Sequence, residues 1–314
     1  MKLIFKIKRN LFELRYRWTL SEFLILKLVS IIHRLGITTR TLDNYSKELA
    51  NNNFKKKWLK QENDQYLFDF KGAKLPYIEN QEILLSLRSV FDDVFFVSCY
   101  FNDNYDKHTV EYLDKYISEG TYGYVDGNFD VTVKEGDVVI DAGAWIGDFS
   151  AYAASKGAVS YAFEPTKDTY KLLCETKSLN EGRIFPVQKG LGDYCGKTDI
   201  LIKGDHNWGN SMISEGNTLK TIKEEKIFVT TLDRFVEENH LTKVDFIKAD
   251  IEGAERDMLK GASNVLKTFA PKLTICTYHL PDDPEVLEKI ILEINPNYKI
   301  KHLRKKLFAA VPKH

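Results

Sequence analysis

The chain has 314 residues, in which 45 Lys and Arg residues balance 45 Asp and Glu residues. This length fits one large domain or one domain with an extension. The hydrophobic content of 43% is enough to form a core and excludes an intrinsically disordered chain. The balanced charge does not indicate a nucleic-acid partner. The four cysteines lie too far apart for a zinc ribbon or a disulfide framework, so we expect a cytoplasmic protein.

Residues 1–40 are basic, with nine Lys and Arg residues against two Glu residues and with apolar residues interleaved. They contain no uninterrupted apolar region and no small-residue cleavage site, so we expect neither a signal peptide nor a membrane span. A basic amphipathic stretch either packs on its own domain or on a second subunit, or lies on an anionic membrane surface. We therefore expect a packing element, a homo-oligomer contact or a peripheral contact with the inner membrane face.

Residues 1–110 as a whole are predicted to form a mostly helical N-terminal extension. Within it, residues 66–70 and 74–78 flank a Gly-containing turn and read as a β-hairpin. Residues 83–91 carry apolar side chains at helical spacing. The extension is thus expected to be an α+β unit that precedes a larger domain at residues 111–314.

The pattern in residues 111–314 is an alternation of strands and helices. This alternation predicts an α/β fold, a Rossmann-like parallel sheet with helices on both faces and an antiparallel strand at one edge. In such a sheet, ligands bind at the carboxyl ends of the strands. The expected strands are 138–140, 159–163, 184–187, 244–248, 273–276, 298–302 and 306–311. The expected helices are one after the turn that follows residue 141, one at 167–179, one opening near 231, one after residue 250 with an acidic first turn, and one at 284–293.

The segment Asp141–Gly147 follows a strand and opens a helix. A dinucleotide fingerprint would need glycines at positions that Trp145 and Asp148 occupy, and Asp148 would repel a pyrophosphate at the helix N-terminus. Glu164 ends the next strand, where a carboxylate accepts ribose hydroxyls. These features describe an adenosine ligand with a cationic tail, which S-adenosylmethionine fits. The residues expected to bind it are Asp141, Gly143, Ala144, Gly147 and Glu164, with Asp193 either at the adenine edge or only ending a loop.

Three segments, at residues 141–147, 230–235 and 244–261, resemble the FkbM-type methyltransferases. The resemblance extends over about residues 119–312 and implies a class I, Rossmann-like, S-adenosylmethionine-dependent O-methyltransferase. The family acts mostly on secondary metabolites and surface sugars. Tyr122 lies in the entry segment before the first strand of the domain, and we expect it to contact the substrate.

Three polar residues are candidates for the chemistry, namely Asp250, Glu252 and His279. Methyl transfer to a hydroxyl needs an aligned acceptor and removal of its proton. His279 is predicted to be the base, with Asp250 orienting it or the substrate and Glu252 contacting the substrate. Alternatively, His279 caps a loop, and Glu252 only complements the dipole of the helix in whose first turn it lies, as we expect of Glu255. The same three side chains could also hold Mg²⁺ or Mn²⁺.

Residues 206–212 form a polar insert, within which Trp208 is expected to stack on a sugar while Asn210 and Ser211 bind hydroxyls. The alternative is a turn that closes a β-hairpin. Together these features predict an O-methyltransferase acting on a sugar, a glycan or a glycan precursor. Two alternatives are a nicotinamide-dependent oxidoreductase and a catalytically silent module that binds S-adenosylmethionine and tethers a partner.

Overall fold

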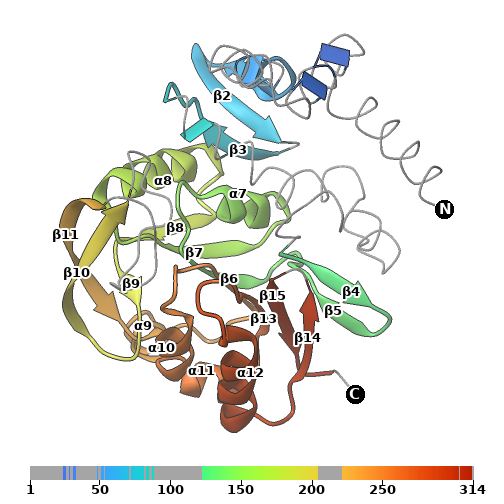
Figure 1. Ribbon diagram of the computed structural model, residues 1–314, viewed down its shortest axis with the longest axis vertical. Coiled ribbons are helices and arrows are strands. Elements are labelled where there is room, and N and C mark those ends of the chain that lie inside the picture. Colours follow the sequence, from blue (N-terminus) through green and yellow to red (C-terminus); the bar gives the residue numbers. More distant parts are fainter. Residues whose placement is uncertain are drawn as a thin grey trace.

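The computed structural model describes residues 54–70, 72–80, 122–203, 221–303 and 305–312, together with isolated positions between 24 and 87. Its centre is a seven-stranded sheet in the order β14-β15-β13-β12-β6-β7-β8 (Figure 1). The strands from β13 to β8 along this order are parallel, β15 is antiparallel to β13, and β14 is antiparallel to β15. The bounds are β6 Val138–Ala142, β7 Val159–Phe163, β8 Ile184–Val187, β12 Phe246–Ala249, β13 Lys272–Cys276, β14 Lys299–Leu303 and β15 Lys306–Ala310. This order confirms the predicted Rossmann-like α/β fold.

Helices cover both faces of the sheet because successive strand residues point to opposite sides. Val139 joins the core under α7 and α8, whereas its neighbour Ile140 joins the core under the other four helices. Figure 1 shows these two layers above and below the sheet. The bounds are α7 Asp148–Ser155, α8 Lys167–Leu179, α9 Leu232–Glu238, α10 Glu255–Lys260, α11 Ser263–Thr268 and α12 Asp283–Ile294.

A second, three-stranded antiparallel sheet packs on the outer side of α7 and α8. Its strands are β1 (Leu59–Glu62), β2 (Gln65–Phe70) and β3 (Ala73–Pro76), so a third strand joins the expected hairpin. Asn180, at the end of α8, ties the layers together: its side chain accepts from the Lys74 N–H at 3.1 Å and donates to the Lys74 carbonyl at 2.7 Å. These strands of the N-terminal extension therefore form a layer of the folded protein.

The rest of the N-terminal extension lies mostly outside the described residues. This applies to almost all of the basic segment 1–40 and to the expected boundary near residue 110. Among the described parts of the chain, no helix is both long and apolar enough to cross a bilayer. The packing, oligomer and membrane roles of residues 1–40 stay predictions.

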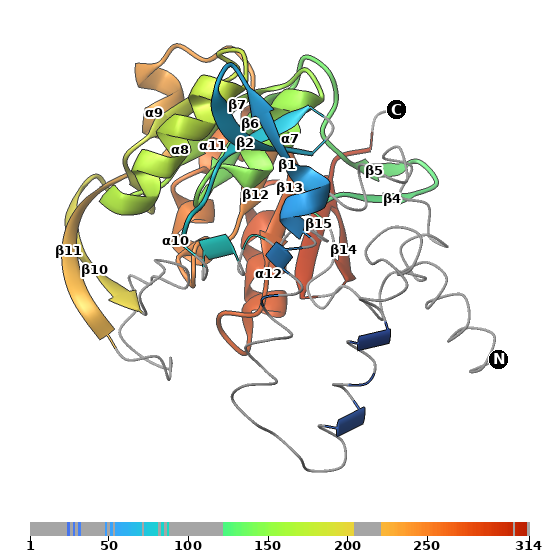
Figure 2. The ribbon, with the colours of Figure 1, turned by 90° about the horizontal axis from the view of Figure 1, so that it is seen from above.

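One hairpin was not predicted from the sequence, and a second was expected only as the alternative in which the polar insert closes a β-hairpin. β4 (Tyr124–Asp126) pairs with β5 (Phe129–Val131). β10 (Gly196–Lys203) and β11 (Thr221–Thr230) form a long antiparallel ribbon at the side of the molecule, seen in Figure 2, and β9 (Gly190–Leu191) pairs with β11 in parallel. The ribbon flanks the insert that carries Trp208, Asn210 and Ser211, which itself lies outside the described residues.

Candidate functional site

The glycine turn after β6 lies against the ends of both neighbouring strands. The N–H groups of Gly143 and Ala144 donate to the Phe163 carbonyl at the end of β7. Gly143 has φ of 74°, and a Cβ atom there would lie 2.0 Å from the Asp250 carbonyl oxygen beyond β12. Only glycine satisfies both conditions, since a side chain would be strained and would overlap backbone. The turn thus joins the predicted cofactor residues to the predicted catalytic strand end.

Gly147 ends this turn and is the N-cap of α7, with φ of 89°. A Cβ atom there would lie 2.7 Å from the Leu173 side chain in α8. Gly147 therefore allows α7 to start close to α8. Its predicted contact with the cofactor stays a prediction.

Asp141 is fully buried at the end of β6 and already has two protein partners. Its carboxylate accepts from the Ser150 hydroxyl at 2.7 Å and pairs with Lys248 Nζ at 3.1 Å. Lys248 is also buried and donates to the Gly143 carbonyl at 2.6 Å. Burial would lower the pKa of Lys248, but the charges of Asp141, Asp250 and Asp148 raise it above its ordinary value. We therefore expect Asp141 to support the turn through Lys248 rather than to face a ligand directly.

Glu164 follows β7 directly and lies beside the glycine turn. Its carboxylate accepts hydrogen bonds from the backbone N–H and the hydroxyl of Thr166. Burial raises the pKa of Glu164 to about 7, against the lowering effect of these hydrogen bonds. A buried carboxylate of this kind gains from a ligand that supplies further donors.

Asp250, just beyond β12, is held by two tyrosines. Tyr122 donates its hydroxyl to Asp250 Oδ2 at 2.8 Å, and Tyr278 donates to Oδ1 at 2.9 Å. Burial would raise the pKa of Asp250, but the charges of Lys248, His279 and Lys306 hold it below its ordinary value. Asp250 is therefore a fixed anion, and Tyr122, expected at the substrate, lies directly beside it.

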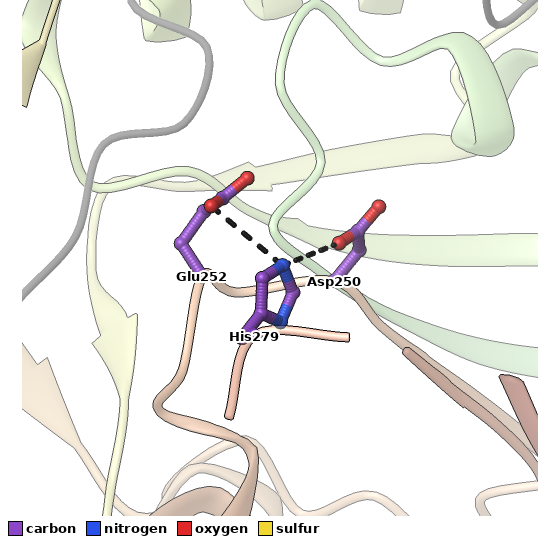
Figure 3. A group of neighbouring side chains, drawn as sticks. All are labelled: Asp250, Glu252 and His279. Carbon is purple, nitrogen blue, oxygen red and sulfur yellow. Dashed lines mark ion pairs between the residues drawn. The ribbon is translucent and has the colours of Figure 1, made fainter. Parts of the chain in front are cut away.

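His279 lies beyond β13, among three carboxylates. Its Nδ1 is 2.9 Å from Glu255 Oε1, and its Nε2 is 3.5 Å from Asp250 Oδ1 and 3.6 Å from Glu252 Oε2 (Figure 3). Neither ring nitrogen makes a hydrogen bond of good geometry with the described residues, so these contacts are ion pairs. The carboxylate nearest the ring is Glu255, which gives it the orienting role that the sequence had suggested for Asp250.

The electrostatics of this cluster favour a positive charge at the ring. Burial would lower the pKa of His279, but the contact with Glu255 and the charges of Glu255, Asp250 and Glu252 raise it to about 9. At neutral pH the imidazole therefore carries a proton unless another cation replaces it.

The structure brings most of the predicted residues to one edge of the sheet. Asp250, Glu252 and His279 meet there, next to Tyr122, the glycine turn and Glu164. Asp193 follows β9 and is exposed, so its contact with an adenine ring stays a prediction. Trp208, Asn210 and Ser211 lie outside the described residues.

Sequence reasoning missed Lys248, Tyr278 and the second function of Glu255. Glu255 is fully buried and accepts from the backbone N–H groups of Ile251 and Gly253 at 2.9 and 3.0 Å, which fixes the turn before α10. That part was expected from its place in the first helical turn; its contact with His279 was not. A lysine inside an otherwise apolar strand was the one available signal for Lys248.

The sheet order and the glycine turn after β6, the middle one of its five parallel strands, define a Rossmann-like fold of the class I methyltransferase type. The sequence profile of the family described as "Methyltransferase FkbM domain" matches residues 141–310, and the chain belongs to this family. It is similar to hexuronic acid methyltransferase AglP of Haloferax volcanii, with 29% identity over 174 residues that cover 55% of this chain and 68% of the relative.

Two solved structures are also similar to this chain. The FkbM methyltransferase of Methylobacillus flagellatus matches with 20% identity and a TM-score of 0.44, over 74% of this chain and 56% of that one. Fibrillarin of Aeropyrum pernix, solved with bound S-adenosyl-L-methionine, matches with 16% identity and a TM-score of 0.36, over 67% of this chain and 76% of that one. The chain thus spans little more than half the length of the solved FkbM protein.

Proposed function

We propose that this protein is an S-adenosylmethionine-dependent O-methyltransferase that acts on a hydroxyl of a sugar, a glycan or a glycan precursor. The observation that carries the proposal is the contact between the glycine turn and the end of β12, which places Gly143 against the backbone of Asp250. A cofactor on the turn and an acceptor at the cluster of Asp250, Glu252 and His279 would then be neighbours. Membership of a methyltransferase family favours this reading over an oxidoreductase.

The residues at the turn fit an adenosyl ligand better than a dinucleotide. Gly143 lets the turn lie directly against the Asp250 backbone, and Glu164 offers a buried carboxylate for ribose hydroxyls. Asp148 begins α7, where a pyrophosphate would bind, and a carboxylate there opposes phosphate. Burial raises the pKa of Asp148 to about 7, so a substantial fraction is charged at neutral pH. S-adenosylmethionine, when bound, supplies a methyl group on a sulfonium and leaves as the neutral thioether S-adenosylhomocysteine.

The chain's own residues position the acceptor and handle its proton. His279 and Asp250 are the residues that we assign to catalysis, and Glu252 and Tyr122 to acceptor binding. A cofactor held at the glycine turn and Glu164 would supply the methyl group, and its sulfur would keep the electron pair of the carbon–sulfur bond. The hydroxyl proton passes to the carboxylates of the cluster of His279, Asp250 and Glu252, because the imidazole already carries a proton at neutral pH. The partial burial of the cluster limits the access of water and strengthens these interactions.

A hexuronic acid is the first acceptor to test, because the AglP relative is named for one. The test has two steps. Calorimetric titration of the full chain with S-adenosylhomocysteine should show saturable binding, which a nicotinamide cofactor should not produce. Transfer of label from methyl-labelled S-adenosylmethionine should then be measured with a panel of hexuronic acids, neutral sugars and their nucleotide- and lipid-linked forms. Label on no sugar in the panel, despite cofactor binding, would contradict the proposed acceptor class.

A further inference from the structure

Three atoms that can bind a cation converge beyond β12 and β13, namely His279 Nε2 and one carboxylate oxygen each of Asp250 and Glu252. Figure 3 shows His279 pointing between the carboxylates of Asp250 and Glu252. The ring Nε2 is 3.5 Å from the Asp250 oxygen and 3.6 Å from the Glu252 oxygen, and one ligand atom from each residue lies within 4.8 Å of the others. Atoms of this kind repel one another unless a positive charge lies between them.

A proton alone explains these distances poorly. An imidazolium N–H draws a carboxylate oxygen to about 2.7–2.9 Å in a charge-assisted hydrogen bond. Here Nε2 is buried and nearly equidistant from two carboxylates, and it makes no hydrogen bond with the described residues. The His279 side chain is only 7% exposed, so bulk water is not a ready alternative partner.

The same distances suit two ligands of one metal ion. First-row divalent ions bind nitrogen and oxygen ligands at about 2.0–2.2 Å, which places neighbouring ligand atoms roughly 3.0–3.5 Å apart. A metal ion between the three residues needs a movement of only a few tenths of an ångström. Three protein ligands also leave coordination positions for oxygens of an acceptor.

The surrounding residues hold the three side chains in the manner expected of a metal site. Glu255 lies 2.9 Å from the other ring nitrogen of His279, as an outer carboxylate does beside a metal-binding histidine. Tyr122 and Tyr278 fix Asp250 by hydrogen bonds. Glu252 has φ of 56°, a left-handed backbone that a glutamate adopts at a cost and that is typical of functional sites.

A second group, Glu255 with His279 and Asp283, also lies close enough to hold an ion. Its carboxylates are already engaged, since Glu255 accepts two backbone N–H groups and Asp283 pairs with Arg256 at 2.9 Å. Asp250 also accepts two hydrogen bonds, but Asp250 and Glu252 are partly exposed, whereas Glu255 and Asp283 are buried. The side of the ring that faces Asp250 and Glu252 is therefore the more accessible site.

We propose that Asp250, Glu252 and His279 bind one divalent metal ion, with Mn²⁺ preferred over Mg²⁺ because one ligand is an imidazole. The proposal deepens the proposed function and rests on it only for the ion's purpose, which is to hold oxygens of the acceptor. When the metal ion is bound, His279 is one of its protein ligands.

The test uses the full chain, stripped of metal with a chelator, and Mn²⁺ as the probe. Free Mn²⁺ is followed by electron paramagnetic resonance, so no turnover is needed. Wild type should bind one Mn²⁺ saturably, Mg²⁺ should compete, and Glu252→Gln should weaken binding by at least ~10-fold through loss of a charged ligand. Glu252 is partly exposed, so this variant should fold, which circular dichroism would verify. The matched control is Glu288→Gln, which alters the exposed Glu288–His302 pair and should leave Mn²⁺ binding unchanged.

Absence of saturable Mn²⁺ binding at millimolar concentrations overturns the metal site, as does equal binding by Glu252→Gln and wild type. A titration of the same sample with S-adenosylhomocysteine separates this outcome from failure of the proposed function. Cofactor binding without Mn²⁺ binding refutes the metal site alone. Mn²⁺ binding without cofactor binding refutes the proposed function alone.

Discussion

Replacing Glu164 with Gln should weaken cofactor binding and, at the same time, stabilise the ligand-free protein at alkaline pH. The carboxylate is buried, and its pKa is raised from 4.5 to about 7. A raised carboxyl pKa means that the unfolded chain releases this proton more readily than the folded protein. The stability that the neutral form provides is complete below about pH 4.5 and is lost as the pH rises through about 7. The glutamine side chain cannot ionise, so the variant avoids this loss.

The size of the effect follows from the difference between the two pKa values. At about 1.36 kcal/mol per pH unit, the loss between pH 5 and pH 8 is roughly 2–3 kcal/mol. The stability of Glu164→Gln relative to wild type should therefore rise by that amount over this range. A hydrogen bond that the glutamine amide makes less well than the carboxylate changes the unfolding free energy by the same amount at pH 5 and at pH 8. It therefore does not affect the difference between the two pH values. Urea unfolding of both proteins at the two pH values measures the difference.

The affinity for S-adenosylhomocysteine should move in the opposite direction. Loss of a hydrogen bond to a charged group costs about 1.5–3 kcal/mol, or roughly 10- to 150-fold in the dissociation constant. In wild type, affinity should be constant above about pH 7 and fall below it, because binding favours the ionised carboxylate. Calorimetry measures both quantities. A variant that binds as tightly as wild type, or a stability difference that does not change with pH, would refute the assignment of Glu164.

Three further substitutions test the site. Gly143→Ala introduces a Cβ atom 2.0 Å from the Asp250 carbonyl oxygen at a residue with positive φ. It should therefore lower the unfolding free energy by at least ~1–3 kcal/mol and abolish measurable S-adenosylhomocysteine binding. Wild-type affinity in this variant would contradict the role of the turn. His279→Ala should lower turnover by about 10²–10⁴ while leaving cofactor affinity within about twofold, and His302→Ala, at the exposed pair, should change neither. Lys248→Met leaves the buried Asp141 without its cation and should lower the free energy of unfolding in denaturant by about 3–5 kcal/mol. A loss below about 1 kcal/mol would contradict our inference that the Asp141–Lys248 pair supports the glycine turn.

The central sheet could be predicted because its sequence signals are local. Short β-branched runs alternate with helical periodicity from β6 to β13, and this alternation alone implies parallel pairing with crossover helices. The long β10–β11 ribbon gave no such signal. Its second strand includes the run Lys223, Glu224, Glu225 and Lys226, in which polar residues follow one another instead of alternating with apolar ones.

The part of the candidate site that could be predicted consists of residues that directly follow neighbouring strands of the sheet. Asp250 and His279 come just after neighbouring parallel strands, so their proximity follows from the topology. The contacts of Lys248 with the Gly143 carbonyl and of Glu255 with His279 depend on side-chain directions in three dimensions. No spacing in the sequence encodes these contacts.

The junction between the N-terminal sheet and α8 can be tested through Asn180. Its side chain satisfies both backbone groups of Lys74 and also donates to the Thr176 carbonyl at 2.6 Å. Asn180→Ala leaves the half-buried backbone groups of Lys74 without these partners, at up to about 1–3 kcal/mol for each unsatisfied group. The matched control is Asn239→Ala, which follows α9 and loses a single bond to the Phe235 carbonyl within its own helix.

Because β1 to β3 pack on α7 and α8 as one layer, loss of the Asn180 bridge should weaken the whole fold rather than release a separate unit. Urea unfolding of Asn180→Ala should remain a single transition, shifted by about 2–4 kcal/mol, whereas Asn239→Ala should shift by about 1 kcal/mol or less. The same argument predicts that limited proteolysis does not remove residues 54–80 while the central sheet remains folded. If the variant instead unfolds in two steps, with the N-terminal strands first, the extension is an independent unit and Asn180 only a contact between domains. Then residues 54–80 would be dispensable for the stability of the glycine turn, which α7 and α8 adjoin.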